Sequence, residues 1–180
     1  MKTLIALFRG INVGGKNLLP MKQLVSIMED IGCLDVITYI QSGNVVFRSE
    51  ENRTSQLSGK ISSAINKQHG FEPYILLLEA ADIEKAISGN PFPEAESEPK
   101  SLHVGFLSAT PKKPDSQTLE TLRKKTERFV LKDAVFYLHA PEGVGRSKLA
   151  ASAEKLIGVS MTGRNWRTLC KIKDLVEELN

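Results

Sequence analysis

Apolar residues along the chain recur with two different spacings, one typical of strands and the other typical of helices. Residues 3–8 and 73–79 are short, nearly uninterrupted apolar runs, which predict buried strands. Between them, apolar residues three and four apart predict a helix that begins near Pro20 and ends before Gly32, and a second helix that ends near Gly70. Residues 35–40 and 44–48 predict two more strands, joined by a glycine-containing turn as a hairpin.

The resulting order for residues 1–89 is βαββαβ, with a short helix over 82–88 at its end, which is typical of the ferredoxin-like arrangement. Residues 90–100 are rich in Pro and Glu and predict a linker. The pattern of residues 101–180 predicts strands over 102–107, 128–131 and 134–139, and helices over 115–125, 147–157 and 165–179. We therefore expect an α+β protein with two ferredoxin-like (α/β plait) subdomains, 1–89 and 101–180, in one compact unit. Their similar order suggests a duplication.

Composition limits the classes of protein to which the chain can belong. The 180 residues are 41% hydrophobic and 25% charged, as in ordinary globular domains. No apolar run approaches the roughly 20 residues that span a bilayer, and the apolar stretch after Lys2 ends at Arg9, too early for a signal peptide. The two cysteines, Cys33 and Cys170, fit no disulfide or metal-binding pattern. These features predict a cytoplasmic protein without a membrane partner, a metal or a cofactor.

The first candidate for chemistry is the glycine-rich stretch RGINVGGKN, residues 9–17, between a strand and a helix. Gly10, Gly15 and Lys16 match the phosphate-binding P-loop, but Asn17 stands where that motif needs a hydroxyl. In a P-loop the helix also begins near the lysine, which would place Pro20 inside the helix at a cost of about 3 kcal/mol. A nucleotide-hydrolysing P-loop is therefore disfavoured. Converging backbone N–H groups together with Arg9 and Lys16 predict an anion-binding loop instead, with a flexible connection as the alternative.

Two further stretches carry polar or basic residues at turns and helix starts. The hairpin tip offers Gln41, Ser42 and Asn44, which are also ordinary turn residues. Arg146 and Arg164 precede two predicted helices, where a positive charge opposes the helix dipole unless an anion offsets it. The candidate ligand-binding residues are Arg9, Gly10, Asn12, Gly14, Gly15, Lys16, Gln41, Ser42, Asn44, Arg146, Arg164 and Asn165.

No recognisable catalytic set accompanies these candidates. His69, His103 and His139 lack metal-binding spacing, and Cys170 falls on the apolar stripe of a predicted helix. Trp166 fits the same stripe and predicts a core anchor rather than a base-stacking platform. The pattern leaves open whether the protein is an enzyme.

With RGINVGGKN, YIQSGNVVF, the NPF of residues 90–92 and the TGRNW of residues 162–166 in view, the chain resembles the domain-of-unknown-function family 1697 (DUF1697) over nearly its whole length. The resemblance implies one compact unit of two α/β subdomains and a bacterial, cytoplasmic setting, without an assigned activity. The family's shared stretches map onto residues 9–15, 41–47 and 164–166. Members often carry Asn after the tryptophan, where this chain has Arg167, so that position is not carried over as a ligand contact.

Three functions remain as hypotheses. The leading one is binding of an anionic or phosphorylated small molecule in a cationic cleft between the subdomains, formed by the glycine loop, the hairpin tip and the Arg164 region. The first alternative is nucleic-acid binding through the basic stretch 146–173, although only 6% of residues are aromatic and no exposed aromatic pair is evident. The second alternative is a homo-oligomeric structural or interaction protein. The oligomeric state is not predicted.

Overall fold

The computed structural model describes residues 1–51 and 54–180, and contacts divide the chain into two compact units. Unit 1 comprises residues 1–84 together with 171–180, and unit 2 comprises residues 85–170. Each unit contains a four-stranded antiparallel sheet and a hydrophobic core of its own. The expected α+β class is confirmed.

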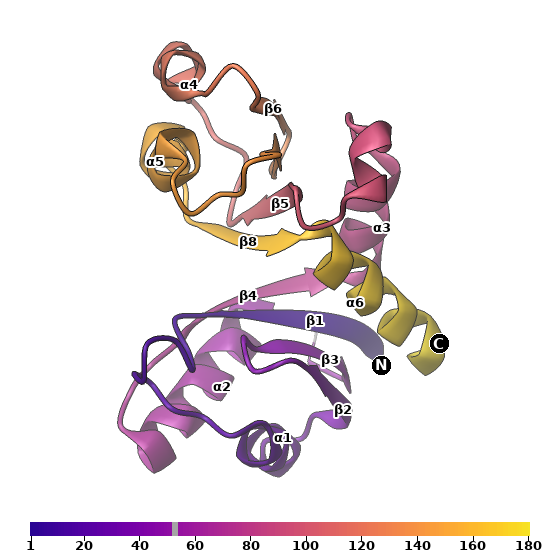
Figure 1. The fold of residues 1–180 in the computed structure, drawn as a ribbon. Coiled ribbons are helices and arrows are strands. Elements are labelled where there is room, and N and C mark those ends of the chain that lie inside the picture. The colour runs from indigo at the N-terminus through magenta and orange to yellow at the C-terminus, as the bar shows by residue number, and fades with distance from the viewer. Residues whose placement is uncertain (52–53) are drawn as a thin grey trace. The chain divides into compact units, whose positions relative to one another are not determined.

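Unit 1 follows the order βαββαβ that its hydrophobic pattern predicts (Figure 1). Its elements are β1 (Lys2–Arg9), α1 (Met21–Asp30), β2 (Leu34–Tyr39), β3 (Asn44–Ser49), α2 (Thr54–His69), β4 (Tyr74–Glu79) and the first residues of α3 (Ala80–Ser88). The sheet order is β2-β3-β1-β4, which is the ferredoxin-like order. Helices α1 and α2 cover one face of the sheet, where Leu24 and Ile61 join the core around Phe47.

Unit 2 has the sheet order β6-β7-β5-β8. Its elements are a 3₁₀ helix (Pro93–Ser97), β5 (Leu102–Leu107), α4 (Ser116–Leu122), β6 (Arg128–Lys132), β7 (Val135–His139), α5 (Lys148–Ile157), β8 (Met161–Asn165) and the start of α6 (Trp166–Leu179). Helices α4 and α5 pack against one face of this sheet through Leu119, Leu149 and Ala153. Asp115 caps α4 by accepting a hydrogen bond from the Thr118 N–H at 3.0 Å.

The two units repeat one topology. Each runs through βαββαβ and continues into a further helix, and the two sheet orders become identical when β5 to β8 are renumbered as β1 to β4. The two halves are therefore more alike than the sequence suggests. The sequence predicts that the second half ends in two helices without a fourth strand, whereas the structure contains that strand.

The missed strand is β8, Met161–Asn165. Its sequence MTGRN is short, contains a glycine and shows no apolar alternation, so no local signal marks it. It forms because the whole segment pairs antiparallel with β5, from Leu107 opposite Met161 to His103 opposite Asn165. The strand places TGRNW, expected as a helix start, largely inside the sheet.

The boundaries of the units also differ from the predicted subdomains. The predicted linker 90–100 belongs to unit 2, and Phe92 within it is buried. The last ten residues, 171–180, belong to unit 1. Two hydrogen bonds hold the end of α6 in unit 1. The Thr3 hydroxyl donates to Asn180 Oδ1 at 2.8 Å, and Arg48 donates to the Leu179 carbonyl.

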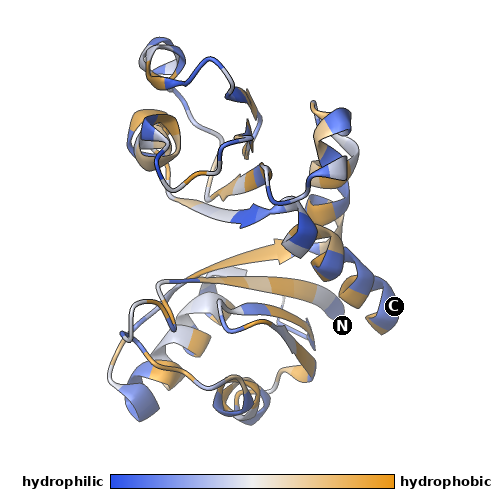
Figure 2. Ribbon diagram, viewed as in Figure 1, coloured by the Kyte–Doolittle hydropathy of each residue, from blue (hydrophilic) through white to orange (hydrophobic). Residues whose placement is uncertain are grey.

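The distribution of apolar and polar residues matches the packing of the helices on the sheets (Figure 2). Strand β1 is apolar almost throughout because it is buried on both faces: Leu4 and Ile5, which point to opposite faces, are each at most 1% exposed. The helices carry both apolar and polar faces, as expected for helices that cover a sheet. Within residues 1–51 and 54–180, no helix combines the length and apolar character needed to cross a bilayer.

Candidate functional site

The glycine loop of unit 1 folds as a tight hairpin of its own. The Asn12 N–H donates to the Asn17 carbonyl and the Lys16 N–H to the Val13 carbonyl, each at 3.1 Å. Gly14 and Gly15 form the turn, with φ values of 58° and 73° that residues other than glycine rarely adopt. Helix α1 begins only at Met21, so the loop is not the strand-to-helix turn of a P-loop, in agreement with the argument from Pro20.

The glycine loop and the hairpin tip meet in space, which the sequence could not establish. The Asn12 side-chain amide donates to the carbonyls of Leu19 and Gln41, both at 2.9 Å, and its oxygen accepts from the Leu19 N–H at 2.8 Å. The Phe8 N–H donates to the Gly43 carbonyl at 2.9 Å. Asn12 therefore holds the two segments together.

Asn44 also shapes the hairpin tip itself. Its side chain is completely buried and donates to the Tyr39 carbonyl at 3.0 Å and to Ser42 Oγ at 3.3 Å. The exposed candidates in this unit are Gly10, Gly14, Gly15, Lys16 and Gln41. The Arg9 guanidinium lies 5.4 Å from the centre of the Tyr74 ring in a cation–π contact.

In unit 2, β8 carries Arg164 and Asn165 to the start of α6. Asn165 Oδ1 accepts from the Thr168 N–H at 2.9 Å and so acts as the helix cap. The Arg164 guanidinium donates to the Gly163 carbonyl at 2.8 Å, and burial lowers its pKa to about 10, which still leaves it charged at neutral pH. Arg146 is exposed in the loop before α5. Convergence of these residues with the glycine loop stays a prediction.

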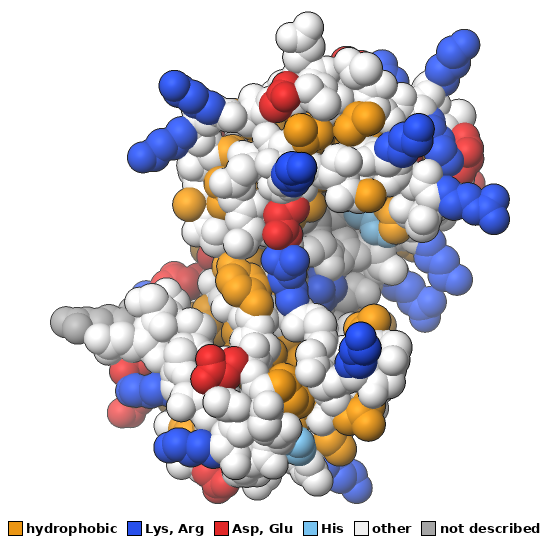
Figure 3. Space-filling view, turned by 90° about the vertical axis from the view of Figure 1, so that its left-hand side faces the viewer, with side chains coloured by type: hydrophobic (Ala, Val, Ile, Leu, Met, Phe, Trp, Pro, Cys, Tyr) orange, Lys and Arg blue, Asp and Glu red, His pale blue; other side chains and the backbone are white. Residues whose placement is uncertain are grey.

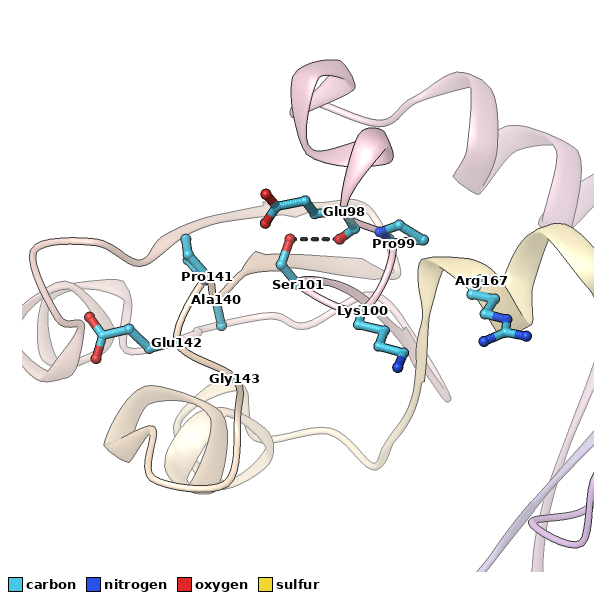
Figure 4. Close-up of a pocket in the computed structure, with 9 residues that line it drawn as sticks. All are labelled: Glu98, Pro99, Lys100, Ser101, Ala140, Pro141, Glu142, Gly143 and Arg167. Carbon is cyan, nitrogen blue, oxygen red and sulfur yellow. Dashed lines mark hydrogen bonds between the residues drawn. The ribbon is translucent and has the colours of Figure 1, made fainter.

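A cavity of about 540 Å³ lies at the end of the sheet of unit 2, and sequence reasoning did not identify it (Figure 4). It is called here the Lys100 pocket, after one of the residues that line it. The Ala140 N–H donates to the Ser101 carbonyl at 2.8 Å, which extends the β5–β7 ladder by one rung, and both residues line the pocket. Arg167, in the first turn of α6, lines the same pocket.

The charges that line the Lys100 pocket are not balanced pair by pair. Glu142 accepts hydrogen bonds from Thr126 Oγ1 at 2.7 Å and Lys124 Nζ at 3.0 Å, and these two bonds hold its pKa below the usual value. Within the described part of the chain, no carboxylate lies at ion-pair distance from Lys100 or Arg167. In Figure 4 the two cations extend to one side of the pocket, and Glu142 lies at the opposite side.

Two signals could have pointed to this pocket. Lys100 lies at the end of the predicted linker, two residues before a predicted strand. Arg167 departs from the family pattern and lies in the first turn of a helix, where a positive charge opposes the helix dipole. The two residues are far apart in sequence, and only the pairing of β5 with β8 brings them to the same end of a sheet.

Two observations on the described residues bear on acid–base and metal chemistry. Burial raises the pKa of the Cys33 thiol to about 11, so the thiol stays protonated. Among residues 1–51 and 54–180, no three His, Cys, Asp or Glu side chains are grouped to hold a metal ion.

His103 on β5 predicts a specific pH dependence. Burial lowers its pKa below the usual value near 6.5, so the unfolded chain binds a proton that the folded chain resists. Stability should therefore fall as the pH drops from about 6.5 through the lowered pKa, and His103→Gln should lose less stability over that range. Urea unfolding followed by the fluorescence of Trp166, the single tryptophan, measures this at pH 7.5 and 5.0. Equal losses in both proteins contradict the prediction.

Comparison with known proteins agrees with the fold. The family model described as "Protein of unknown function (DUF1697)" matches residues 1–137. A solved structure, that of the conserved bacterial protein SP0830 from Streptococcus pneumoniae, is 25% identical with a TM-score of 0.69, over 97% of this chain and 98% of that one. No curated protein matches. Because the family model covers well over half of the sequence, the chain belongs to the DUF1697 family.

Proposed function

We propose that the protein binds a small anionic molecule in the Lys100 pocket. The observation that carries this proposal is the presence of two cations without a carboxylate partner among the described residues, in a cavity large enough for a small molecule. Among the described residues, the lining contains one carboxylate besides that of Glu142, which is that of Glu98 on the segment before β5. An anion at Lys100 and Arg167 supplies the missing counter-charge.

The position of Arg167 supports the same function. It is the second residue of α6, whose first turn contains no acidic residue. A positive charge there opposes the helix dipole, and a bound anion removes that conflict. Arginine binds phosphate or carboxylate through two parallel hydrogen bonds, and the lysine ammonium adds a point charge. The pair therefore suits a phosphate, phosphonate or carboxylate group.

The charge distribution favours this function over nucleic-acid binding. Two lysines of the basic C-terminal stretch are paired with acids, Lys171 with Glu178 at 3.8 Å and Lys173 with Glu177 at 3.3 Å. On the face drawn in Figure 3, Lys and Arg side chains stand singly or in small groups, separated by neutral surface and by Asp and Glu. Nucleic acid is bound by many phosphate contacts along a basic surface.

Calorimetric titration with inorganic phosphate and with pyrophosphate tests the proposal. We expect Lys100→Gln and Arg167→Gln each to weaken binding about tenfold, because each removes one charge-assisted contact. Lys113→Gln, in the exposed loop between β5 and α4, is the matched control and should leave affinity unchanged.

Three outcomes overturn the proposal. The first is the absence of binding to the unmodified protein, and the second is an equal effect in the Lys113→Gln control. The third is tighter binding of a single-stranded oligonucleotide whose affinity falls steeply with salt, because that slope reports many released counterions rather than one anion.

A further inference from the structure

A second cavity, of about 300 Å³, lies in unit 2 between the sheet and α5. It exists because the residues that face one another there are small: Gly105 and Gly163 on the sheet, and Ala150 and Ala153 on α5. A Cβ added to Gly163 would meet nothing within 4 Å, whereas the space over Gly105 is filled by the Met161 side chain. The cavity is therefore open over Gly163 on β8.

The lining of this cavity is mostly apolar, and its polar side chains are those of His103, Arg164 and Asn165 on β5 and β8. Phe136, Leu138 and Met161 contribute apolar side chains, and His103 and Asn165 stand opposite each other on the last paired rung of β5 and β8. His103 Nε2 is buried and has no hydrogen-bond partner among the described residues. An apolar pocket with a few polar groups is the usual form of a small-molecule site.

The two cavities lie on the same face of the β5–β7 ladder. His103 pairs with Leu138, and both residues line the cavity between the sheet and α5. Two residues away along β5, Ser101 accepts a hydrogen bond from Ala140, and these two residues line the Lys100 pocket. Residues two apart on a strand point to the same face, so Ser101 and His103 lie on one face of β5, about 7 Å apart along the strand. One organic molecule of modest size spans that separation.

Building on the proposed function, we propose that the ligand is an aromatic organic anion. Its phosphate, phosphonate or carboxylate contacts Lys100 and Arg167, and its ring enters the cavity between β8 and α5. A hydroxyl or N–H on the ring donates to His103 Nε2, which otherwise stays without a partner. The apolar cavity thus selects the body of the ligand, and the cations select its charge.

Calorimetry with inorganic phosphate, benzylphosphonate and 4-hydroxybenzylphosphonate tests this inference. Benzylphosphonate should bind at least about tenfold more tightly than phosphate, because its ring leaves water. Gly163→Leu places a side chain in the cavity at a position where an added Cβ meets nothing within 4 Å, so it should abolish that advantage and leave phosphate affinity unchanged. Gly145→Leu is the matched control, since Gly145 is exposed, has open space around it and lines neither cavity.

His103→Phe is the second variant that tests this inference. It removes the nitrogen acceptor, so the hydroxyl of 4-hydroxybenzylphosphonate should no longer increase affinity over benzylphosphonate. Unfolding followed by Trp166 fluorescence checks that each variant is folded. If Gly163→Leu is not folded, Ala150→Leu fills the cavity from the α5 side and takes its place.

The outcomes separate this inference from the proposed function. If phosphate binds and Gly163→Leu still binds benzylphosphonate more tightly than phosphate, the ring lies elsewhere. The inference then fails, whereas the proposed anion site is not contradicted. If no anion binds, the neutral probe 4-methylphenol still tests the cavity through the Met161 methyl signal in methyl-labelled protein. A shift of that signal, absent in Gly163→Leu, supports the ring site alone, and no shift overturns it.

Discussion

Replacing Gly43 with alanine is expected to destabilise unit 1 by about 3 kcal/mol. Gly43 has a φ of 77°, a conformation that costs an L-residue roughly 1–2 kcal/mol. The added Cβ would also lie 2.6 Å from Phe8 Cβ and 2.6 Å from Ile11 Cδ1. Both neighbours are at most 1% exposed and belong to the core, so relief requires repacking, at about 1–3 kcal/mol.

Urea unfolding followed by far-UV circular dichroism measures this loss, and amide exchange of Val45 and Phe47 localises it to β3. Gly59→Ala is the matched control in the same unit. Gly59 lies in α2 with open space around it, so alanine there should stabilise the protein by about 0.5–1 kcal/mol. A Gly43→Ala protein as stable as the unmodified chain contradicts the packing described for the hairpin tip.

Asn12→Ala is expected to cost about 2–3 kcal/mol of stability. The substitution removes three hydrogen bonds that join the glycine loop to Leu19 and to the hairpin tip, at about 1 kcal/mol each. It also places alanine at a φ of 54°, which asparagine tolerates better. The same denaturation experiment measures the effect.

Two further variants separate these contributions. Asn12→Gly removes the conformational cost of the positive φ but loses the three hydrogen bonds. Asn12→Asp keeps only the hydrogen bond that is accepted from the Leu19 N–H. Stability should therefore be lost in all three proteins, while phosphate affinity at the Lys100 pocket stays unchanged. Unchanged stability together with reduced affinity for an anion would show instead that Asn12 is a ligand contact.

The family's shared stretches in unit 1 have a structural role. Gly43 and Asn44 in QSGN, and Asn12 in RGINVGG, are engaged in holding a loop against a hairpin. Glycine and asparagine suit such a joint because they accept a positive φ and offer short polar side chains. Turn chemistry and ligand chemistry use the same residue types, so a sequence pattern alone does not distinguish them.

The sequence by itself determined the features that depend on local physics. Apolar spacing was sufficient for the helices and for seven of the strands, with small shifts at their ends, and Pro20 correctly marked the start of α1. Gly43 adopts the positive φ that its position in the hairpin turn predicts. Such features are encoded within a few neighbouring residues, because backbone preference and side-chain periodicity act over one or two turns.

Only the tertiary structure decided the rest. The segment MTGRN becomes strand β8 through its partner β5, because hydrogen bonds to a distant segment outweigh a weak local preference. That pairing carries Arg167 to the pocket that contains Lys100, and it sets Gly163 opposite Gly105 so that a cavity remains beneath α5. Both candidate binding features depend on contacts between residues far apart in the chain, and no spacing along the sequence records those contacts.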